Sequence, residues 1–526
     1  MGICMSIFRA SLIASALAVL AFPAAAAAPA FRLEEATIAD VHSAMKAGTL
    51  TCRALVSAYL ARIAAYDKQG PAFNAIVMTN PNALAEADAL DQRFKQGGLT
   101  GPLHCVPAIV KDNFETIGLQ SAGGSLSLKG FVSDKDAFQV KRIKAAGAIV
   151  LAKSNMAEFA FSPIETVNSL LPGYTRNPYA LDRVTAGSSG GTAAAMAANF
   201  GLIGFGSDTG DSIRGPAAHQ ALAGIRSTMG LTSRAGVIPL NLLADIAGPM
   251  TRTLTDAVTV FQVIAGEDPA DPATAAAHGR KIPDYKASLI ATGLKGARIG
   301  VLHQAYERQP DGVDPEVTSV FAAAIDALKR AGAVIVDPAA VNLDQVKRNP
   351  DAATCMGFKY DINAWLASHG DRVPMHSLDD IVASRLFHPS IEVRIKSAQQ
   401  AMPQGPGSDA CKQEMAYRKA FGDAVTKAMT EMKLDAFVYP TWSFPPRLIG
   451  DLNTPGGDNN QVFSPTSGFP AITVPMGYTR DGRLPAGVTF FGRAWDEPTL
   501  IKLAYSYEQA THHRHPPASA PPLLQP

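Results

Sequence analysis

Serines and glycines gather in one segment of the chain, "TAGSSGGTAAAMAANFGLIGFGSDTGDSIRGPAA", which runs from Thr185 to Ala218. A serine hydroxyl attacks a carbonyl carbon efficiently only when a neighbouring base takes its proton. Histidine often supplies that base, but the segment contains no histidine, and the next one along the chain is His219. The segment therefore raises two questions: which serine is a nucleophile, and which residue activates it.

Three interpretations of the segment rest on the segment's own pattern, although the first of them would also need an acid and a histidine later in the chain. Gly187, Ser189 and Gly191 match G-x-S-x-G, the nucleophile elbow of α/β-hydrolases. Sequence this rich in glycine and serine matches that pattern by chance, and no strong apolar strand precedes it. A phosphate-binding loop is disfavoured because G-x-x-x-x-G-K-[ST] does not occur. In the third interpretation, the small residues only let helices pack closely.

A set of motifs along the whole chain resembles the amidase signature family of serine hydrolases. "GSSGGTAAAMAA" and "GSDTGDSIRGPAA" form its centre, and "GPLHCVPAIVKDNF" lies upstream. "DIAGPMTRTLTDA", "SGFPAITVPMG" and "LPAGVTFFGRAWDEPTLIKLAYSYEQAT" follow in the order that the family has. The resemblance covers roughly residues 34–511, so it is far more specific than any one of these motifs.

The resemblance implies a catalytic set of two serines and a lysine. Ser212 takes the place of the nucleophile, Ser188 that of a serine on a cis peptide bond, and Lys111 that of the base. Lysine accepts a proton only when it is neutral, and burial in an apolar site lowers its pKa toward neutrality. Ser188 would then relay the proton from Ser212 to Lys111 and return it to the leaving amine.

The loop before Ser212 is expected to stabilise the negative charge that forms on the substrate oxygen. By resemblance, the donors of this oxyanion hole are the main-chain N–H groups of Thr209, Gly210, Asp211 and Ser212. Asp208 and Arg214 flank the loop, and we expect them to form an ion pair that holds it in place.

Two residues depart from the pattern of the family. Asp211 stands where glycine is usual, and we expect its carboxylate to disfavour anionic substrates and to raise the pKa of Lys111 by charge attraction. Cys105 also stands where glycine is common, and we interpret it as a packing residue.

Apolar runs that alternate with helical patterns indicate how these residues are positioned. "VPAIVKDN" (106–113), "GLIGFGS" (201–207) and "LDAFVYP" (434–440) read as buried strands, and "PEVTSVFAAAIDALKRAG" (315–332) reads as a helix. Such alternation predicts an α/β fold. We expect a single large domain with a mixed, mostly parallel central sheet and helices on both of its faces.

The ends of the chain carry their own signals. Arg9, a short apolar stretch and an alanine run predict a signal peptide over residues 1–28, with export to the periplasm or the medium. The amidase domain would span residues 29–526, with a flexible proline-rich tail at 512–526. We expect the histidines of this tail to belong to a frayed terminus rather than to a metal site. The cysteines left after cleavage are interpreted as core thiols, although a disulfide between Cys355 and Cys411 is an alternative.

The composition is that of an ordinary globular protein, and a formal net charge of +1 gives no argument for nucleic acid or membrane partners. The resemblance to the amidase signature family implies an enzyme that hydrolyses the C–N bond of a small neutral amide, or a related ester, aryl amide or carbamate, without metal or cofactor, and we predict that it is a monomer or homodimer. Apolar residues expected to line its acyl pocket are Met156, Phe159, Phe161, Leu170, Trp442 and Phe463. The alternatives are the glutaminase subunit of a tRNA-dependent amidotransferase and a non-catalytic binding protein on the same fold.

Overall fold

The structure, a computed structural model, describes residues 1–2, 31–162, 168–307, 312–349, 353–451, 453–454 and 456–523. Apart from its first two residues, the predicted signal peptide lies outside the described part of the chain. Among the described residues, no helix combines the length and the apolar character that crossing a bilayer requires.

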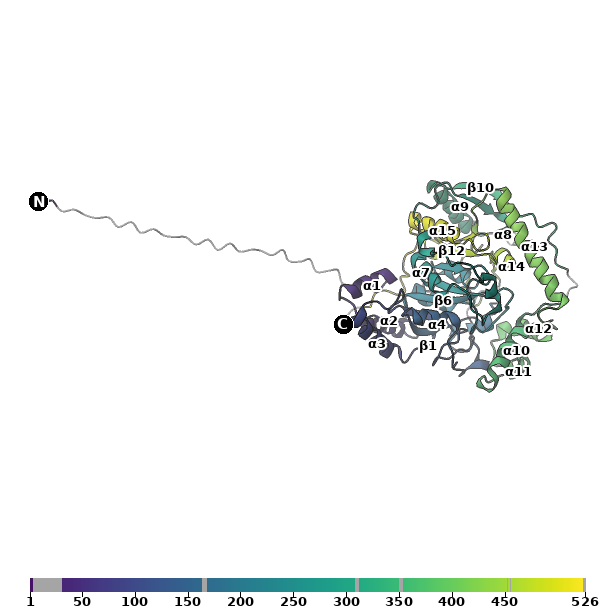
Figure 1. The fold of residues 1–526 in the computed structure, drawn as a ribbon, viewed down its shortest axis with the longest axis horizontal. Helices are drawn as coiled ribbons and strands as arrows, with labels where there is room; N and C mark the ends of the chain where they lie inside the picture. Colours follow the sequence, from purple (N-terminus) through teal and green to yellow (C-terminus); the bar gives the residue numbers. More distant parts are fainter. Residues whose placement is uncertain are drawn as a thin grey trace.

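A mixed sheet forms the centre of the molecule (Figure 1). Within the described residues it has eleven strands in the order β1-β3-β2-β6-β8-β7-β12-β13-β11-β9-β10, and β4 and β5 form a separate pair. The strands are β1 (Ile76–Thr79), β2 (Pro107–Lys111), β3 (Ile149–Ser154), β4 (Asn168–Ser169), β5 (Gly173–Tyr174), β6 (Ile203–Asp208), β7 (Ala223–Arg226), β8 (Ile246–Thr251), β9 (Arg298–Leu302), β10 (Val334–Ala339), β11 (Ala436–Pro440), β12 (Ala471–Thr479) and β13 (Leu484–Phe491).

Parallel pairing occurs in two blocks of the sheet, β3-β2-β6 and β11-β9-β10. The strands between these blocks pair antiparallel, as does the edge strand β1 with β3. The predicted single α/β domain with a mixed sheet is confirmed, and antiparallel strands make up the middle of that sheet.

Helices cover the sheet and share one large hydrophobic core with it. α7 packs on β7 and β8 and contacts α4 and α15, whereas α5 packs on β2 and β6 and α6 packs on β12 and β13. The helices are α1 (Ile38–Lys46), α2 (Cys52–Tyr66), α3 (Ala83–Gly97), α4 (Phe138–Ala145), α5 (Gly190–Ala197), α6 (Arg214–His219), α7 (Leu254–Ile264), α8 (His303–Tyr306), α9 (Pro315–Arg330), α10 (Phe358–His369), α11 (Leu378–Ser384), α12 (Glu392–Gln400), α13 (Asp409–Glu431), α14 (Phe463–Ser467) and α15 (Glu497–Thr511).

A smaller hydrophobic core lies under α10, α11 and α12. These helices pack against the loops that follow β2 and β3, through residues such as Phe131, Phe159 and Phe358. α13 leads from this helical region along one edge of the molecule back toward the sheet (Figure 1). The region therefore stands over one end of the sheet as a helical cover.

The C-terminal segment departs from the prediction of a flexible tail. The Arg514 guanidinium pairs with Glu35 at 2.7 Å, and Arg62 donates to the carbonyls of Ala520 and Pro521 at 2.9 Å. A buried guanidinium group needs hydrogen-bond acceptors, and the C-terminal segment supplies them to Arg62. The described part of this segment, up to residue 523, is thus packed against α2 and the start of the domain.

The cysteines also depart from the interpretation as core thiols. Cys355 pairs with Cys411, as the alternative prediction had it, and Cys52 pairs with Cys105. Cys105 is therefore half of a disulfide that ties α2 to the segment before β2, and its interpretation as a simple packing residue was wrong.

Candidate active site

Adjacent parallel strands bring Lys111 to the serine-rich segment. β2 and β6 are hydrogen-bonded neighbours, with Val110 paired to Phe205, and every residue of both strands is buried. Parallel neighbours end at the same edge of a sheet, where α/β proteins commonly place their sites. Lys111 ends β2, and the loop that carries Ser212 follows β6.

Lys111 is held by two serines inside the protein. Its Nζ lies 2.7 Å from Oγ of Ser188 and 2.9 Å from Oγ of Ser207, which also accepts from Asn113 at 3.0 Å. The side chain has no solvent exposure. Burial lowers the pKa of Lys111 to about 7, against the attraction of Asp208, Asp245 and Asp211. A large fraction of this amine is therefore neutral near pH 7.

Ser188 follows a cis peptide bond with Gly187, as the resemblance implies. The next residues open α5, which begins at Gly190 and lies close to neighbouring main chain. A Cβ atom on Gly191 would overlap the carbonyl oxygen of Asn155. The small residues of this segment therefore allow the close packing that places Ser188 beside Lys111.

Ser212 lies on the wall of a cavity of about 380 Å³ that opens at this edge of the sheet. Ser188 and Ser189 are fully buried, and Ser189 donates to the carbonyl of Ser207, whereas Ser212 keeps 6% of its surface exposed. The cavity is lined by Ala160, Ser162, Gly187, Thr209, Gly210, Asp211, Ser212, Leu240, Arg394, Gly456, Gly457, Asp458 and Gln461. Of the three serines, Ser212 is the one that can meet a substrate.

The loop over residues 209–212 contributes main-chain groups to the same cavity. Within the described part of the chain, the N–H groups of Thr209, Gly210 and Ser212 donate no hydrogen bond. The hydroxyl of Thr209 donates to Asp245 at 2.5 Å, and Asp245 also accepts from the N–H groups of Leu240 and Asn241. This carboxylate fixes the outer end of the loop.

A buried carboxylate fixes the inner end of the loop. Asp208 forms ion pairs with Arg214 at 3.1 Å and with Arg226 at 2.9 Å, and all three side chains are fully buried. Asp208 also accepts from the N–H of Ile213 at 3.1 Å. Burial would raise the pKa of Asp208, but the two guanidinium groups hold it at about 2. The predicted pair of Asp208 and Arg214 is thus part of a triad.

Asp211 lies against a second carboxyl group in the cavity. Both side chains line the cavity, and Asp458 accepts from the N–H of Asn460 at 2.8 Å and from the amide of Gln461. Burial raises the pKa of Asp458 to about 6. Gly215 leaves the space that Asp211 occupies.

The predicted acyl-pocket residues do not line this cavity. Phe159 and Phe161 pack on Phe358, with ring centroids 5.6 and 4.8 Å apart, because the helical cover needs an apolar core of its own. The others either lie in packing contacts, as Met156, Trp442 and Phe463 do, or stand on the surface, as Leu170 does. The cavity wall is instead mostly polar and glycine-rich.

Four residues of the site were not predicted from the sequence: Ser207, Arg226, Asp245 and Asp458. Arg226 left a usable signal, since an arginine at the end of an apolar strand needs a buried acidic partner. Ser207 is the last but one residue of β6, at the edge where Lys111 ends. Asp245 and Asp458 sit in loops, where aspartate is common and carries no signal.

The chain is similar to known proteins over most of its length. The model of the Amidase family matches residues 54–501. A probable amidase of Arabidopsis thaliana is 33% identical over 511 residues, which cover 93% of this chain and 92% of that protein. A glutamyl-tRNA(Gln) amidotransferase subunit from Roseiflexus sp. strain RS-1 is 34% identical over 502 residues, covering 92% of this chain and 98% of that protein.

Among solved structures, native peptide amidase from Stenotrophomonas maltophilia superposes with a TM-score of 0.82 at 37% identity, covering 93% of this chain and 99% of that one. The chain therefore belongs to the Amidase family, the amidase signature family that its motifs resemble.

Proposed function

We propose that this chain hydrolyses a C–N amide bond through an acyl-enzyme on Ser212, with Ser188 as the proton relay and Lys111 as the base. The observation that carries the proposal is the buried Nζ of Lys111, 2.7 Å from Oγ of Ser188, with a pKa that burial lowers to about 7. A neutral amine at this place supplies the base that the serine-rich segment lacks.

In the acylation step, Lys111 accepts the proton of Ser188 while Ser188 accepts that of Ser212. Oγ of Ser212 bonds to the carbonyl carbon, and the electron pair of the C=O bond moves to oxygen. The N–H groups of residues 209–212 would stabilise this oxyanion. The proton then returns through Ser188 to the amide nitrogen, the C–N bond breaks and the amine leaves. Water repeats the sequence on the ester and releases the acid.

The cavity favours acyl groups that are uncharged near the scissile bond. Two carboxyl groups, of Asp211 and Asp458, and the guanidinium of Arg394 lie in its wall. Because Asp211 adjoins Ser212 in the chain, we expect an anion beside Ser212 to be repelled. Esters, aryl amides and carbamates can react by the same steps. The likeness to peptide amidase extends the proposal to amides of short peptides.

The relatives named as amidotransferase subunits keep a second candidate in view, a glutaminase that works within a larger enzyme. The two candidates differ in what the isolated chain does. An independent amidase turns over simple amides alone, whereas a glutaminase of that kind prefers glutamine and depends on partner proteins.

We also propose that the protein is exported to the periplasm or the medium. The N-terminal leader pattern motivates this, and two disulfides that use Cys52, Cys105, Cys355 and Cys411 support it. Disulfides form and persist in oxidising compartments and are rare in the cytosol.

The proposal is tested by a fluorophosphonate probe and a panel of neutral amides on the purified chain. We expect labelling and turnover in the wild type and loss of both in Ser212→Ala, with activity down about 10³-fold or more. Ser189→Ala is the matched control, because Ser189 is the nucleophile only in the elbow interpretation. Labelling that survives Ser212→Ala would refute the assignment, and a folded wild type that neither labels nor turns over would indicate a binding protein.

A further inference from the structure

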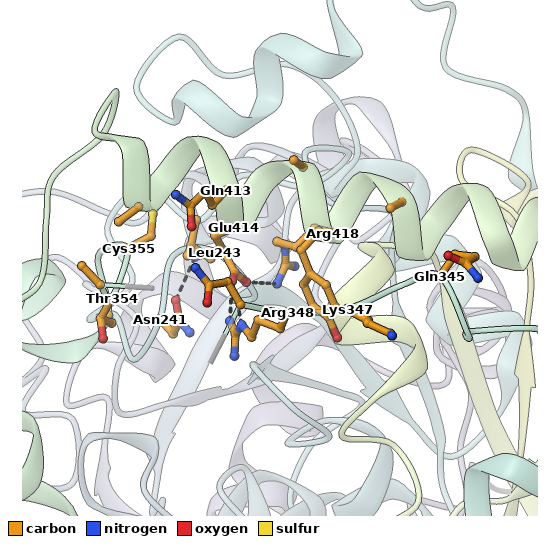
Figure 2. Close-up of a pocket in the computed structure, with 17 residues that line it drawn as sticks. Asn241, Leu243, Gln345, Lys347, Arg348, Thr354, Cys355, Gln413, Glu414 and Arg418 are labelled. Carbon is orange, nitrogen blue, oxygen red and sulfur yellow. Dashed lines mark hydrogen bonds and ion pairs between the residues drawn. The ribbon is translucent and has the colours of Figure 1, made fainter. Parts of the chain in front are cut away.

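A second cavity, of about 620 Å³, lies between α13 and the chain segments 345–349 and 353–357 (Figure 2). Asn241 and Leu243 form a further part of its wall. Its volume is within the range of about 300–1,000 Å³ that small-molecule sites have. The proposed mechanism makes no use of this cavity.

The charged side chains described in its lining have an excess of positive charge. Lys347, Arg348 and Arg418 are cationic, and Glu414 is the one acidic residue among these described lining residues. Arg348 donates to Glu414 at 3.0 and 2.5 Å, and Arg418 lies 3.8 Å from the other carboxylate oxygen. Figure 2 shows both guanidinium groups turned toward Glu414 from opposite walls. This excess of positive charge favours an anionic ligand.

The two arginines are held differently. The Arg418 side chain is 14% exposed and donates to the carbonyl of Pro465 at 2.5 Å, so it stays beside Glu414. The Arg348 side chain is 64% exposed and lies 5.5 Å from the centre of the Tyr417 ring. Arg348 forms the closer pair with Glu414, and Lys347, the residue before it, adds a further positive charge to the same wall, so that the two exposed side chains can bind a carboxylate together from the open side of the cavity.

One loop forms a wall of both cavities. Leu240 lines the catalytic cavity, while Asn241 and Leu243 line the second one. The same loop is tied to Asp245, which anchors Thr209 beside Ser212. The loop of residues 240–245 therefore connects the walls of the two cavities.

Resting on the proposed amidase function, we infer that the second cavity binds a carboxylate carried by the acyl part of the substrate, remote from the scissile amide. The substrate class is then a peptide amide, or a similar chain, that is uncharged beside the scissile bond and acidic further along.

The test uses acetylated tetrapeptide and pentapeptide amides in which one glutamate is moved along an alanine chain, with glutamine as its uncharged match at each position. Acetyl-alaninamide serves as a short substrate that cannot reach the second cavity. The proteins are wild type, Arg348→Gln and Lys347→Gln, with Lys419→Gln on α13 as the control, because Lys419 is outside the cavity lining.

We expect the wild type to prefer glutamate over glutamine about tenfold in kcat/KM at the remote positions, and to disfavour glutamate next to the amide. Arg348→Gln or Lys347→Gln should reduce the remote preference toward one without changing turnover of acetyl-alaninamide, whereas Lys419→Gln should keep it. Equal rates for remote glutamate and glutamine, or a preference unchanged in both cavity variants, would overturn the inference.

Binding of the same peptides to Ser212→Ala, measured by calorimetry, separates this inference from the catalytic proposal. A tighter Kd for remote glutamate, lost in Arg348→Gln, supports the subsite even if turnover is absent. Turnover of acetyl-alaninamide without any glutamate preference in binding supports the amidase and rejects the subsite.

Discussion

The side-chain nitrogen of Lys111 lies 2.7 Å from the hydroxyl oxygen of Ser188, and both side chains are fully buried. Three aspartates, Asp208, Asp245 and Asp211, attract the ammonium form, yet burial outweighs them and lowers the pKa of Lys111 to about 7. Near neutral pH, both the neutral and the protonated form of Lys111 are therefore populated.

This balance predicts how the reaction depends on pH. Only the neutral amine accepts a proton, so kcat/KM for a neutral amide should rise with pH and level off above about pH 7–8. The measurement is a profile of kcat/KM between pH 5 and 9. Lys111→Ala should lose about 10²–10⁴-fold in rate and lack the same rising limb. A rising limb centred near the ordinary pKa of lysine would show that burial does not lower the pKa of Lys111.

Much of the site could be predicted from the sequence because its chemistry sits in contiguous motifs. Lys111 ends a continuous apolar run that can only be a buried strand, and Ser188 and Ser212 flank another such run, β6. Because both faces of these strands are buried, their sequences are continuous apolar runs. The strands therefore follow from local sequence, whereas the roles of the motif residues follow from the resemblance to the amidase signature family.

The errors concern contacts between distant parts of the chain. Phe159 and Phe161 are apolar near the motifs, but apolar character does not distinguish a pocket wall from a core, and they pack on Phe358. Arg514 appeared to lie in a loose tail, since its partner Glu35 is at the other end of the chain. Such pairings are set by tertiary packing and leave no local pattern.

Asp211 should set part of the pKa of Lys111. Its carboxylate is among the groups that attract the lysine ammonium and so raise its pKa. Asp211→Gly should therefore move the rising limb of the pH profile to lower pH, and Asp211→Asn, which removes only the charge, should move it in the same direction. Identical profiles for wild type and both variants would contradict this role.

Gly191 should be intolerant of any side chain. A Cβ atom there would overlap the main-chain carbonyl of Asn155, so α5 or the loop after β3 must shift. We expect Gly191→Ala to lower the free energy of unfolding by about 1–3 kcal/mol, as overpacking of a core does. Because α5 follows Ser188, activity should fall as well.

The control for that substitution is Gly97→Ala at the end of α3, where a Cβ atom meets nothing within 4 Å. Alanine is the better helix former, so this variant should be as stable as wild type or up to about 1 kcal/mol more stable. Urea unfolding followed by circular dichroism measures both variants. Equal stability of the two would show that the packing at Gly191 can relax.

The two disulfides, together with the proposed export, predict the state of the protein's thiols. Cys52–Cys105 and Cys355–Cys411 close loops of 53 and 56 residues, and loops of that size stabilise a fold by about 4 kcal/mol in the chain-entropy model. Protein recovered from the periplasm or the medium and unfolded without reductant should therefore give no reaction with a thiol reagent, and it should unfold at lower urea once reduced.

The double variant Cys355→Ser with Cys411→Ser removes one bridge and should lose part of that stability while remaining free of reactive thiols. Four reactive thiols in the exported wild type would instead indicate that the cysteines are unpaired and would remove the structural argument for an oxidising compartment.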